Sequence, residues 1–556
     1  MLSYRKLAMR VLGRPPPYGG GIDSPRPASQ RAAALVLTAA MLTTLAAPAF
    51  AKTWYIENGD ITISAGKTEG TNKVSQGSTT DEEDTDTVIT NNNRDTASSH
   101  TVTIDAGNDK VEVTLDNVNI KADSGSALTS NGDVTLTLKG ENHLTGGNGD
   151  TYGGDGITSS GSLTISGGTV TATGGNNTGS DGSGGSGIYS VSGSVTISGG
   201  TVNATGGEGS KNNSTSGGSG IYSDSGDVTI SGGTVNANGG NGGTISGGDG
   251  ICSSGGVTIS SGSTVTANGG SGEDGSGGRG ITSNGGVTVS GGTVNAKGGS
   301  GKNGNGGDGI LSFNPVAISG GTVKSNGGSG TISGGDGIRS LDHVAISGGT
   351  VKSNGGSGTN SGGYGIISND IDLSGSLELT AKAGSPNGKA LSQRGNELDL
   401  NTIKDKLGPG AKVTTNANGE TKEVSIPRPV EPEKPVIPGE SSSSSDGGSA
   451  APSAPVSSLP GLTVTDKDGQ RISYTSTQSG NILTVCVGRF TASLRASLST
   501  LRQLRAEGID TITFQTILCS TTLSVDELLA MGGEDAEVVL THHIRSSTLT
   551  VGGKAV

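Results

Sequence analysis

Aromatic residues are scarce in this chain. Of its 556 residues only 2% are Phe, Trp or Tyr, and only 29% are apolar. A globular chain of this length normally buries two or more cores rich in large side chains. With 103 glycines present, two alternatives are left: a largely disordered chain, or a repeat in which each unit uses a few apolar residues well.

Cysteine and positive charge are also in short supply. Three cysteines exclude a disulfide framework, although Cys486 and Cys519 lie in one C-terminal region and could pair after export. The formal charge is −13, and it falls to −18 without residues 1–51, which hold six Lys or Arg and one Asp. Such acidity argues against nucleic acid or an anionic membrane as the partner.

One long apolar run is present, from Ala32 to Phe50. It follows basic residues and ends in the small-x-small pattern of a cleavage site, so residues 1–51 are predicted to be a signal peptide. The alternative is a membrane anchor, but the run is shorter than the ~20 residues of a span. We therefore expect a secreted, extracellular protein, associated with the cell surface in one alternative, with no membrane insertion after cleavage.

The rest of the chain repeats itself. "GGSGIYSVSGSVTISGGTVNATGG" (184–207) is followed by "GGSGIYSDSGDVTISGGTVNANGG" (217–240). A Gly-Ile marker recurs at intervals of 28 to 33 residues, at Ile157, Ile188, Ile221, Ile251, Ile281, Ile310, Ile338 and Ile366. Within each repeat apolar and polar residues alternate, which is typical of strands with one buried face. Gly-Gly pairs after these strands are expected to supply positive φ at the corners.

Three short strands per repeat, without a helical pattern, predict a mainly β fold in which each repeat is one coil of a parallel β-helix. A single coil cannot bury its apolar face alone, so the coils must stack. We expect about ten coils of ~30 residues within 52–425. A Pro- and Ser-rich linker is predicted at 426–460. A small α+β domain of unknown function is predicted at 461–556, with a helix from Ser493 to Glu507.

Catalytic residues are not evident. The histidines of the repeat region, His100, His143 and His343, are isolated in sequence, and no clustered acid pair for general acid–base catalysis is apparent. The chain is therefore expected not to be an enzyme, and a polysaccharide lyase is the less favoured alternative.

Aspartates precede several of the Gly-Ile markers. Asp155, Asp249, Asp308 and Asp336 occupy this slot, whereas other coils have Ser, Arg or Tyr there. Carboxylates beside many backbone carbonyls could bind Ca²⁺. An Asp before Gly is equally a common turn residue.

Tyrosines and threonines mark the predicted outer faces. Tyr189 and Tyr222 fill the same outward slot in consecutive coils, and Tyr152 and Tyr364 lie in nearby loops. Exposed rings could bind sugar rings, or the pair could only steady the sheet. A row of outward Thr and Asn residues is interrupted by Lys324 and Lys352, and ice binding is a disfavoured interpretation of it.

The early coils carry a resemblance. "VEVTLDNVNIKADSGSALTSNGDVTLTLKGENHLTGG", followed by "DGITSSGSLTISGGTVTATGG", resembles the secreted bacterial carbohydrate-binding β-solenoids, the cellulose- and pectin-binding domains with a polysaccharide-lyase-like fold. The resemblance covers roughly residues 54–425. It implies a right-handed parallel β-helix, calcium near the coil corners, and binding of plant-type polysaccharides without cleavage. The calcium sites that the resemblance implies match this sequence only in the four Asp-Gly-Ile coils, at Asp155, Asp249, Asp308 and Asp336.

Together these observations predict a secreted, non-catalytic polysaccharide-binding protein, assisted by calcium. The alternative is a surface adhesin or structural spacer whose rod presents residues 461–556 to a surface partner.

Overall fold

The computed structural model describes residues 51–428 except 212, and 462–555 with gaps at 467–469, 473, 480, 488–490, 517–519, 532–535, 543–546 and 553. The predicted signal peptide, the predicted linker and Cys519 lie outside the described residues. The chain divides into two compact units, Met1–Pro432 and Glu433–Val556. It is mainly β, with 51% strand and 6% helix.

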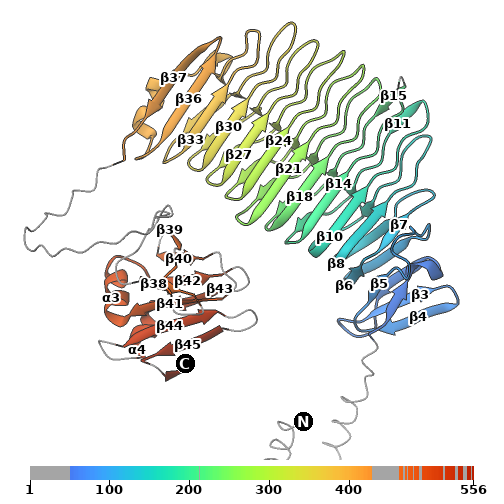
Figure 1. Ribbon diagram of the computed structural model, residues 1–556, viewed down its shortest axis with the longest axis horizontal. Coiled ribbons are helices and arrows are strands. Elements are labelled where there is room, and N and C mark those ends of the chain that lie inside the picture. The colour runs from blue at the N-terminus through green and yellow to red at the C-terminus, as the bar shows by residue number, and fades with distance from the viewer. Residues whose placement is uncertain are drawn as a thin grey trace, which may run out of the picture. The chain divides into compact units, whose positions relative to one another are not determined.

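The first unit is the predicted parallel β-solenoid, with about 13 turns rather than about ten. Its strands lie side by side in parallel columns (Figure 1). The extra turns come from segments without the Gly-Ile marker. Ile61 pairs with Val102, and Val102 pairs with Leu128, so the column of Ile157 continues toward the N-terminus through coils that lack the Gly-Ile marker.

Each regular coil contributes one strand to each of three columns. The first column holds β9 (Ile157–Ser159), β12 (Ile188–Ser190), β16 (Ile221–Ser223), β19 (Ile251–Ser253), β22 (Ile281–Ser283), β25 (Ile310–Ser312), β28 (Ile338–Ser340), β31 (Ile366–Ser368) and β34 (Leu391–Gln393). The second holds β13 (Val195–Ile197), β17 (Val228–Ile230), β20 (Val257–Ile259), β23 (Val287–Val289), β26 (Val316–Ile318), β29 (His343–Ile346) and β32 (Asp370–Leu373). The third holds β14 (Thr201–Thr205), β18 (Gly233–Asn238), β21 (Ser263–Asn268), β24 (Thr293–Lys297), β27 (Thr322–Asn326), β30 (Thr350–Asn354), β33 (Glu378–Lys382) and β36 (Lys412–Ala417).

The earlier coils use longer strands, and two short strands pair in the loops. The long strands are β6 (Val102–Asp116), β8 (Leu128–Thr145) and β10 (Leu163–Thr173), with the short β7 (Asn119–Lys121) between the first two. The loop strands are β11 (Asp181–Ser183) and β15 (Ser214–Ser216).

The alternation seen in the sequence places one face of every strand in the core. In β14, Val202 and Ala204 are fully buried, and Thr201 and Asn203 on the other face are not. Because each coil stacks in register on the next, identical side chains lie above one another: Ile188 on Ile221, and Val202 on Val235. One continuous apolar core therefore runs from Trp54 to Val413.

Two columns of glycine form the neck between each coil and its loop. One follows the third strand and includes Gly240 and Gly270, and the other precedes the first strand and includes Gly248 and Gly278. Backbone hydrogen bonds zigzag between the columns: Gly248 N–H donates to Gly240 O (2.8 Å), Gly270 N–H to Gly248 O (2.8 Å), and Gly278 N–H to Gly270 O (2.8 Å). A Cβ on Gly270 would lie 1.9 Å from Gly240 O, so only glycine fits.

The expectation that Gly-Gly pairs supply positive φ is right at one corner and wrong at another. In the corner between the second and third strands the second glycine has positive φ, as at Gly200 (77°) and Gly321 (80°). The glycines of the neck, such as Gly270, are not among the positive-φ residues. Their requirement is steric, since backbone contacts backbone there.

The N-terminal end of the core is closed by an antiparallel meander. The meander consists of β2 (Ile61–Ala65), β3 (Asn72–Gln76) and β4 (Thr79–Asp84), with β2–β3 and β3–β4 antiparallel. It is flanked by β1 (Thr53–Tyr55), η1 (Ile56–Asn58) and β5 (Val88–Thr90), and β1 pairs parallel with β5. The indole of Trp54 is 3% exposed and donates to the buried Asp84 (2.8 Å). The sequence predicts a strand or cap from Trp54 to Ile63, and Trp54 is indeed part of the cap.

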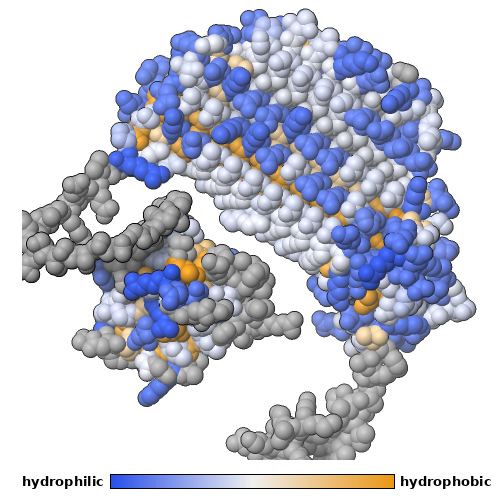
Figure 2. Space-filling model, viewed as in Figure 1, coloured by the Kyte–Doolittle hydropathy of each residue, from blue (hydrophilic) through white to orange (hydrophobic). Residues whose placement is uncertain are grey.

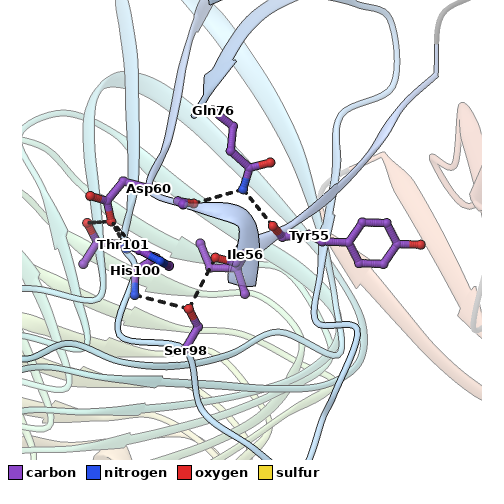
Figure 3. A network of polar contacts seen from close by, with 8 residues as sticks. Tyr55, Ile56, Asp60, Gln76, Ser98, His100 and Thr101 are labelled. Carbon is purple, nitrogen blue, oxygen red and sulfur yellow. Dashed lines mark hydrogen bonds and ion pairs between the residues drawn. The ribbon is translucent and has the colours of Figure 1, made fainter. Parts of the chain in front are cut away.

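Polar contacts tie this meander to the first coils (Figure 3). Within the cap the Gln76 side chain donates to the carbonyls of Tyr55 (2.7 Å) and Gly59 (2.9 Å). The Ser98 hydroxyl donates to the Ile56 carbonyl (3.3 Å) between the coil and the cap. Thr101 N–H donates to Asp60 (2.7 Å), which also lies 3.5 Å from the His100 ring. The meander therefore covers the first coil and hides its strand edges.

The C-terminal end is covered in a similar way. It consists of β35 (Asn396–Glu397), η2 (Leu400–Lys406) and β37 (Glu420–Ser425), the last antiparallel to β36. Leu400 and Ile403 of η2 are buried against the core.

The second unit has two sheets and two helices, which agrees with the predicted α+β class. One sheet holds β38 (Leu462–Thr465), β41 (Ala492–Ser497), β44 (Glu537–His542), β45 (Ser547–Val551) and β46 (Lys554–Ala555), and the other β39 (Thr475–Ser479), β40 (Ile482–Cys486), β42 (Thr511–Gln515) and β43 (Ser520–Ser524). The helices are α3 (Leu498–Ala506) and α4 (Val525–Ala530).

The predicted helix from Ser493 to Glu507 begins too early. Ala492, Leu494 and Ala496 alternate with partly exposed residues, and this segment is strand β41. Ser497 then caps α3 by accepting the Thr500 N–H, which sets the start of the helix.

Among the described residues, no helix has the length and apolarity that crossing a membrane requires.

Gly270→Ala tests the steric role of the neck. We expect a loss of about 2 kcal/mol or more in the free energy of unfolding, because the new methyl group meets a carbonyl that is itself hydrogen-bonded. Gly199→Ala is the matched control, since nothing lies within 4 Å of the position that its methyl group would take. Urea unfolding followed by circular dichroism measures both. Equal stability of the two variants would contradict the steric explanation.

Candidate functional site

Most of the residues singled out in the sequence lie on one strip of the solenoid surface, here called the corner strip. The strip consists of two rows, and every coil contributes one residue to each row. The first row lies two residues before each first-column Ile or Leu: Ser126, Asp155, Ser186, Ser219, Asp249, Arg279, Asp308, Asp336, Tyr364 and Lys389. The second row lies directly after it: Thr129, Thr158, Tyr189, Tyr222, Cys252, Thr282, Leu311, Arg339, Ile367 and Ser392.

The rows touch each other. Thr158 donates to the Asp155 carboxylate (2.7 Å), and Thr282 donates to that of Asp249 from the next coil (2.6 Å). The strip is therefore one surface.

The four aspartates have a structural task that the sequence did not reveal. Each carboxylate accepts the backbone N–H of the first-row residue in the next coil. The backbone N–H of Ser186 donates to Asp155 (2.6 Å), that of Arg279 to Asp249 (2.7 Å), that of Asp336 to Asp308 (2.7 Å) and that of Tyr364 to Asp336 (2.7 Å). Asp at this slot thus joins neighbouring coils where the strand ladder has not yet begun.

These bonds bear on the calcium expectation. One oxygen of each carboxylate is occupied by a backbone donor, and the second oxygens of Asp155 and Asp249 accept threonine hydroxyls. Among the described residues, no group of three or more His, Cys, Asp or Glu side chains could hold a metal ion. The structure brings together one pair of the predicted ligands, Asp308 and Asp336, which are neighbours in the stack.

Tyr189 and Tyr222 stack on each other, with ring centroids 5.2 Å apart and planes inclined by 12°. Each ring therefore places one face against the other ring, and that face is not free for a sugar. The Tyr222 hydroxyl donates to Asp224 (2.7 Å). The arrangement fits a cross-coil pair that stabilises the sheet, one of the two interpretations of the sequence.

The other two tyrosines lie apart from this pair. Tyr152 is 70% exposed and lies in a loop, where its backbone forms an isolated parallel β-bridge with Ser183. It is not part of the corner strip. Tyr364 is in the first row, one coil after Asp336, and lines a groove that the sequence did not indicate.

This groove has a volume of about 310 Å³ and lies across four coils at the C-terminal half of the strip. Its floor is formed by neck glycines and small polar residues. The charged and aromatic side chains that line it are Arg279, Asp308, Asp336, Arg339 and Tyr364. Sequence reasoning missed Arg339, although the residue after each marker Ile was already identified as an outward slot at Tyr189.

The charges in the groove partly balance. Arg279 lies 3.9 Å from Asp308, and Arg339 lies 3.7 Å from Asp336. The carboxylates are nearly buried, with side-chain exposures of 12% and 8%, whereas the guanidinium groups are 44% and 45% exposed. A ligand in the groove would therefore meet the arginines, with the aspartates behind them.

Burial shifts the pKa of these acids. Burial raises the pKa of Asp308. Burial, and then repulsion by Asp308, raises the pKa of Asp336 to about 7. Burial likewise raises the pKa of the Cys252 thiol to about 12, which disfavours the thiolate at neutral pH.

Comparison of the chain with protein-family models, with curated proteins and with solved structures finds no match.

The pKa of Asp336 predicts a pH-dependent stability. An aspartate in an unfolded chain titrates near ~3.9, so between that pH and about 7 the folded protein holds more protons at Asp336 than the unfolded one. Raising the pH through this range therefore lowers the free energy of unfolding. Asp336→Asn keeps an acceptor for Tyr364 and removes the charge, so its stability should fall less over the same range.

Urea unfolding midpoints between about pH 5 and pH 8 measure this difference. Asp274→Asn, which changes an exposed loop carboxylate, is the control and should follow the parent protein. A parallel pH profile for parent and D336N would contradict the assignment.

Proposed function

We propose that this is a secreted, non-catalytic protein that binds polysaccharide in the groove of the corner strip. The observation that carries the proposal is the set of two exposed arginines and one tyrosine that line a groove together with many glycines. Arg279, Arg339 and Tyr364 are the residues that would contact the ligand.

The chemistry of the groove suits a sugar polymer. A guanidinium group offers several N–H donors in a fixed plane to hydroxyl or carboxylate oxygens. A tyrosine ring presents an apolar face and a polar edge, which matches the two kinds of surface of a sugar ring. The groove is lined by residues of four successive coils, so a polymer lying along the rod could contact all of them.

Two sequence features support the same function. The early coils resemble secreted carbohydrate-binding β-solenoids, and the N-terminal segment has the pattern of a signal peptide. The stacked Tyr189 and Tyr222 lie farther along the same strip. A polymer that follows the strip could reach the edges of these rings, and several weak contacts would then add through avidity.

Calcium enters this proposal at the Asp308–Asp336 pair. A cation there would relieve the repulsion between the two carboxylates. It would have to compete with Arg279 and Arg339, which already lie nearby, so we expect calcium to modulate binding without being required.

Retention of the purified protein on insoluble cellulose and on polygalacturonate, with calcium and with chelator, tests the proposal. We expect retention on at least one polymer, and a loss of about tenfold in affinity for Tyr364→Ala or Arg339→Gln. Tyr152→Ala is the matched control, because it removes an exposed ring outside the strip.

Each outcome is informative. Equal losses for Tyr364→Ala and Tyr152→Ala would remove the groove as the site. Loss of binding in chelator would make calcium essential at the carboxylates. No retention on a broad panel of polysaccharides would leave the rod as a spacer that presents residues 461–556.

A further inference from the structure

A second charged feature lies on a different face of the solenoid, the outer face of the third strand column. Three outward residues per strand form three rows along the rod, called here the sheet face. The first row is Thr in seven consecutive coils, from Thr169 to Thr350. The other two rows are Thr and Asn until β24, where lysines enter. Hydrophilic residues gather over these strands in Figure 2, seen from the same side as the labelled strands of Figure 1.

Five consecutive coils each carry one lysine on this face; Lys412 of β36 is paired with Glu423, and the other four form the lysine group. Lys324 of β27 and Lys352 of β30 are direct neighbours in the middle row. Lys297 of β24 and Lys382 of β33 lie one coil before and one coil after them, in the third row. All four side chains are exposed. With coils ~4.8 Å apart, the four lysines span about 14 Å along the rod.

These lysines have no partners within the described part of the chain. The ion pairs of the solenoid use other lysines, namely Lys52, Lys110, Lys302, Lys406, Lys412 and Lys422. The sole carboxylate of the sheet face between Thr169 and Asn416 is Glu378, at the edge of the lysine group. In a chain with a formal charge of −13, this is a local reversal of sign.

The lysines do not take part in the hydrogen-bonded rows of this face. Asparagines at the same positions hydrogen-bond from coil to coil: Asn236 donates to Asn203, Asn268 to Asn238, and Asn354 to Asn326, each at 2.8 Å. A lysine interrupts such a ladder, and two lysines directly opposite each other repel. A stability requirement would favour Asn throughout, so the lysines call for another explanation.

We infer that the sheet face of β24, β27, β30 and β33 binds a linear anionic glycan that runs along the rod. The charge of the lysines favours an anionic partner, and one lysine per coil, in two adjacent rows, suits a polymer whose anionic groups also repeat. The flat rows of Thr and Asn beside them offer hydroxyl and amide groups to the sugar hydroxyls. This site does not depend on the groove, since it uses different strands and different residues.

Dextran sulfate and neutral dextran are suitable probes, because they share a backbone and differ in charge. We expect the full chain to bind dextran sulfate, more weakly as salt rises, and not to bind dextran. K324N/K352N should weaken the binding by about tenfold or more, and K324R/K352R should retain it. Because Asn continues the ladder, K324N/K352N should unfold at the same temperature as the parent protein or higher.

K110N/K302N is the matched control. It removes the same amount of positive charge from lysines that are already paired with Glu112 and Glu273, and it should leave dextran sulfate binding intact. An equal loss of dextran sulfate binding in both double variants would mean that only the net charge of the chain matters, and it would overturn the inference. So would tighter binding of single-stranded DNA than of dextran sulfate, or a dimer that K324N/K352N dissociates. Variants of the groove, such as Y364A, should not affect this binding, which separates the two sites.

Discussion

The solenoid depends on the close approach of backbone to backbone at the glycine neck. There the chain leaves the core after the third strand, makes a loop and returns to the first strand of the next coil. Hydrogen bonds from Gly248 to Gly240 and from Gly270 to Gly248 join the outgoing and returning segments in one continuous zigzag. A methyl group at Gly270 would lie 1.9 Å from a carbonyl oxygen. Loop length can vary beyond the neck because the loops do not contribute to the packing of the core.

This neck also sets the geometry of the candidate groove. The second glycine column is followed at once by the first row of the corner strip, so the neck glycines form the floor and the first-row side chains lie beside it. An aspartate in that row can reach the backbone of the next coil, as Asp308 does with Asp336. Aspartate thus connects coils at all four of its positions in this row. Two of the four, Asp308 and Asp336, also line the groove, where Arg279 and Arg339 lie close to them.

Strict repetition makes exceptions to the repeat informative. Where Thr or Asn occupies an outward slot in coil after coil, the residue continues a row that is ordinary for the surface of a strand, so its presence implies no further role. Lys324 and Lys352 break that rule at a cost to local electrostatics, and Arg339 occupies a slot that holds Tyr189 and Tyr222 elsewhere. The deviations gather in the C-terminal half of the solenoid, so both proposed binding faces lie over the same coils, on different strand columns.

The sequence alone determined the parallel stack, because a period of about 30 residues with alternating Val, Ile and Ala leaves no other way to bury so few apolar side chains. It also indicated the stacked position of Tyr189 and Tyr222, since equal slots in adjacent coils must meet. It indicated an N-terminal strand or cap from Trp54 to Ile63, but it did not reveal the C-terminal cap, which lacks the repeat, or strand β41, where a period of two is hidden before a helix. Only the tertiary structure decided what Asp155 and its counterparts contact, because a carboxylate oxygen can accept a backbone N–H, a hydroxyl or a cation, and the donor lies a whole coil away in the chain.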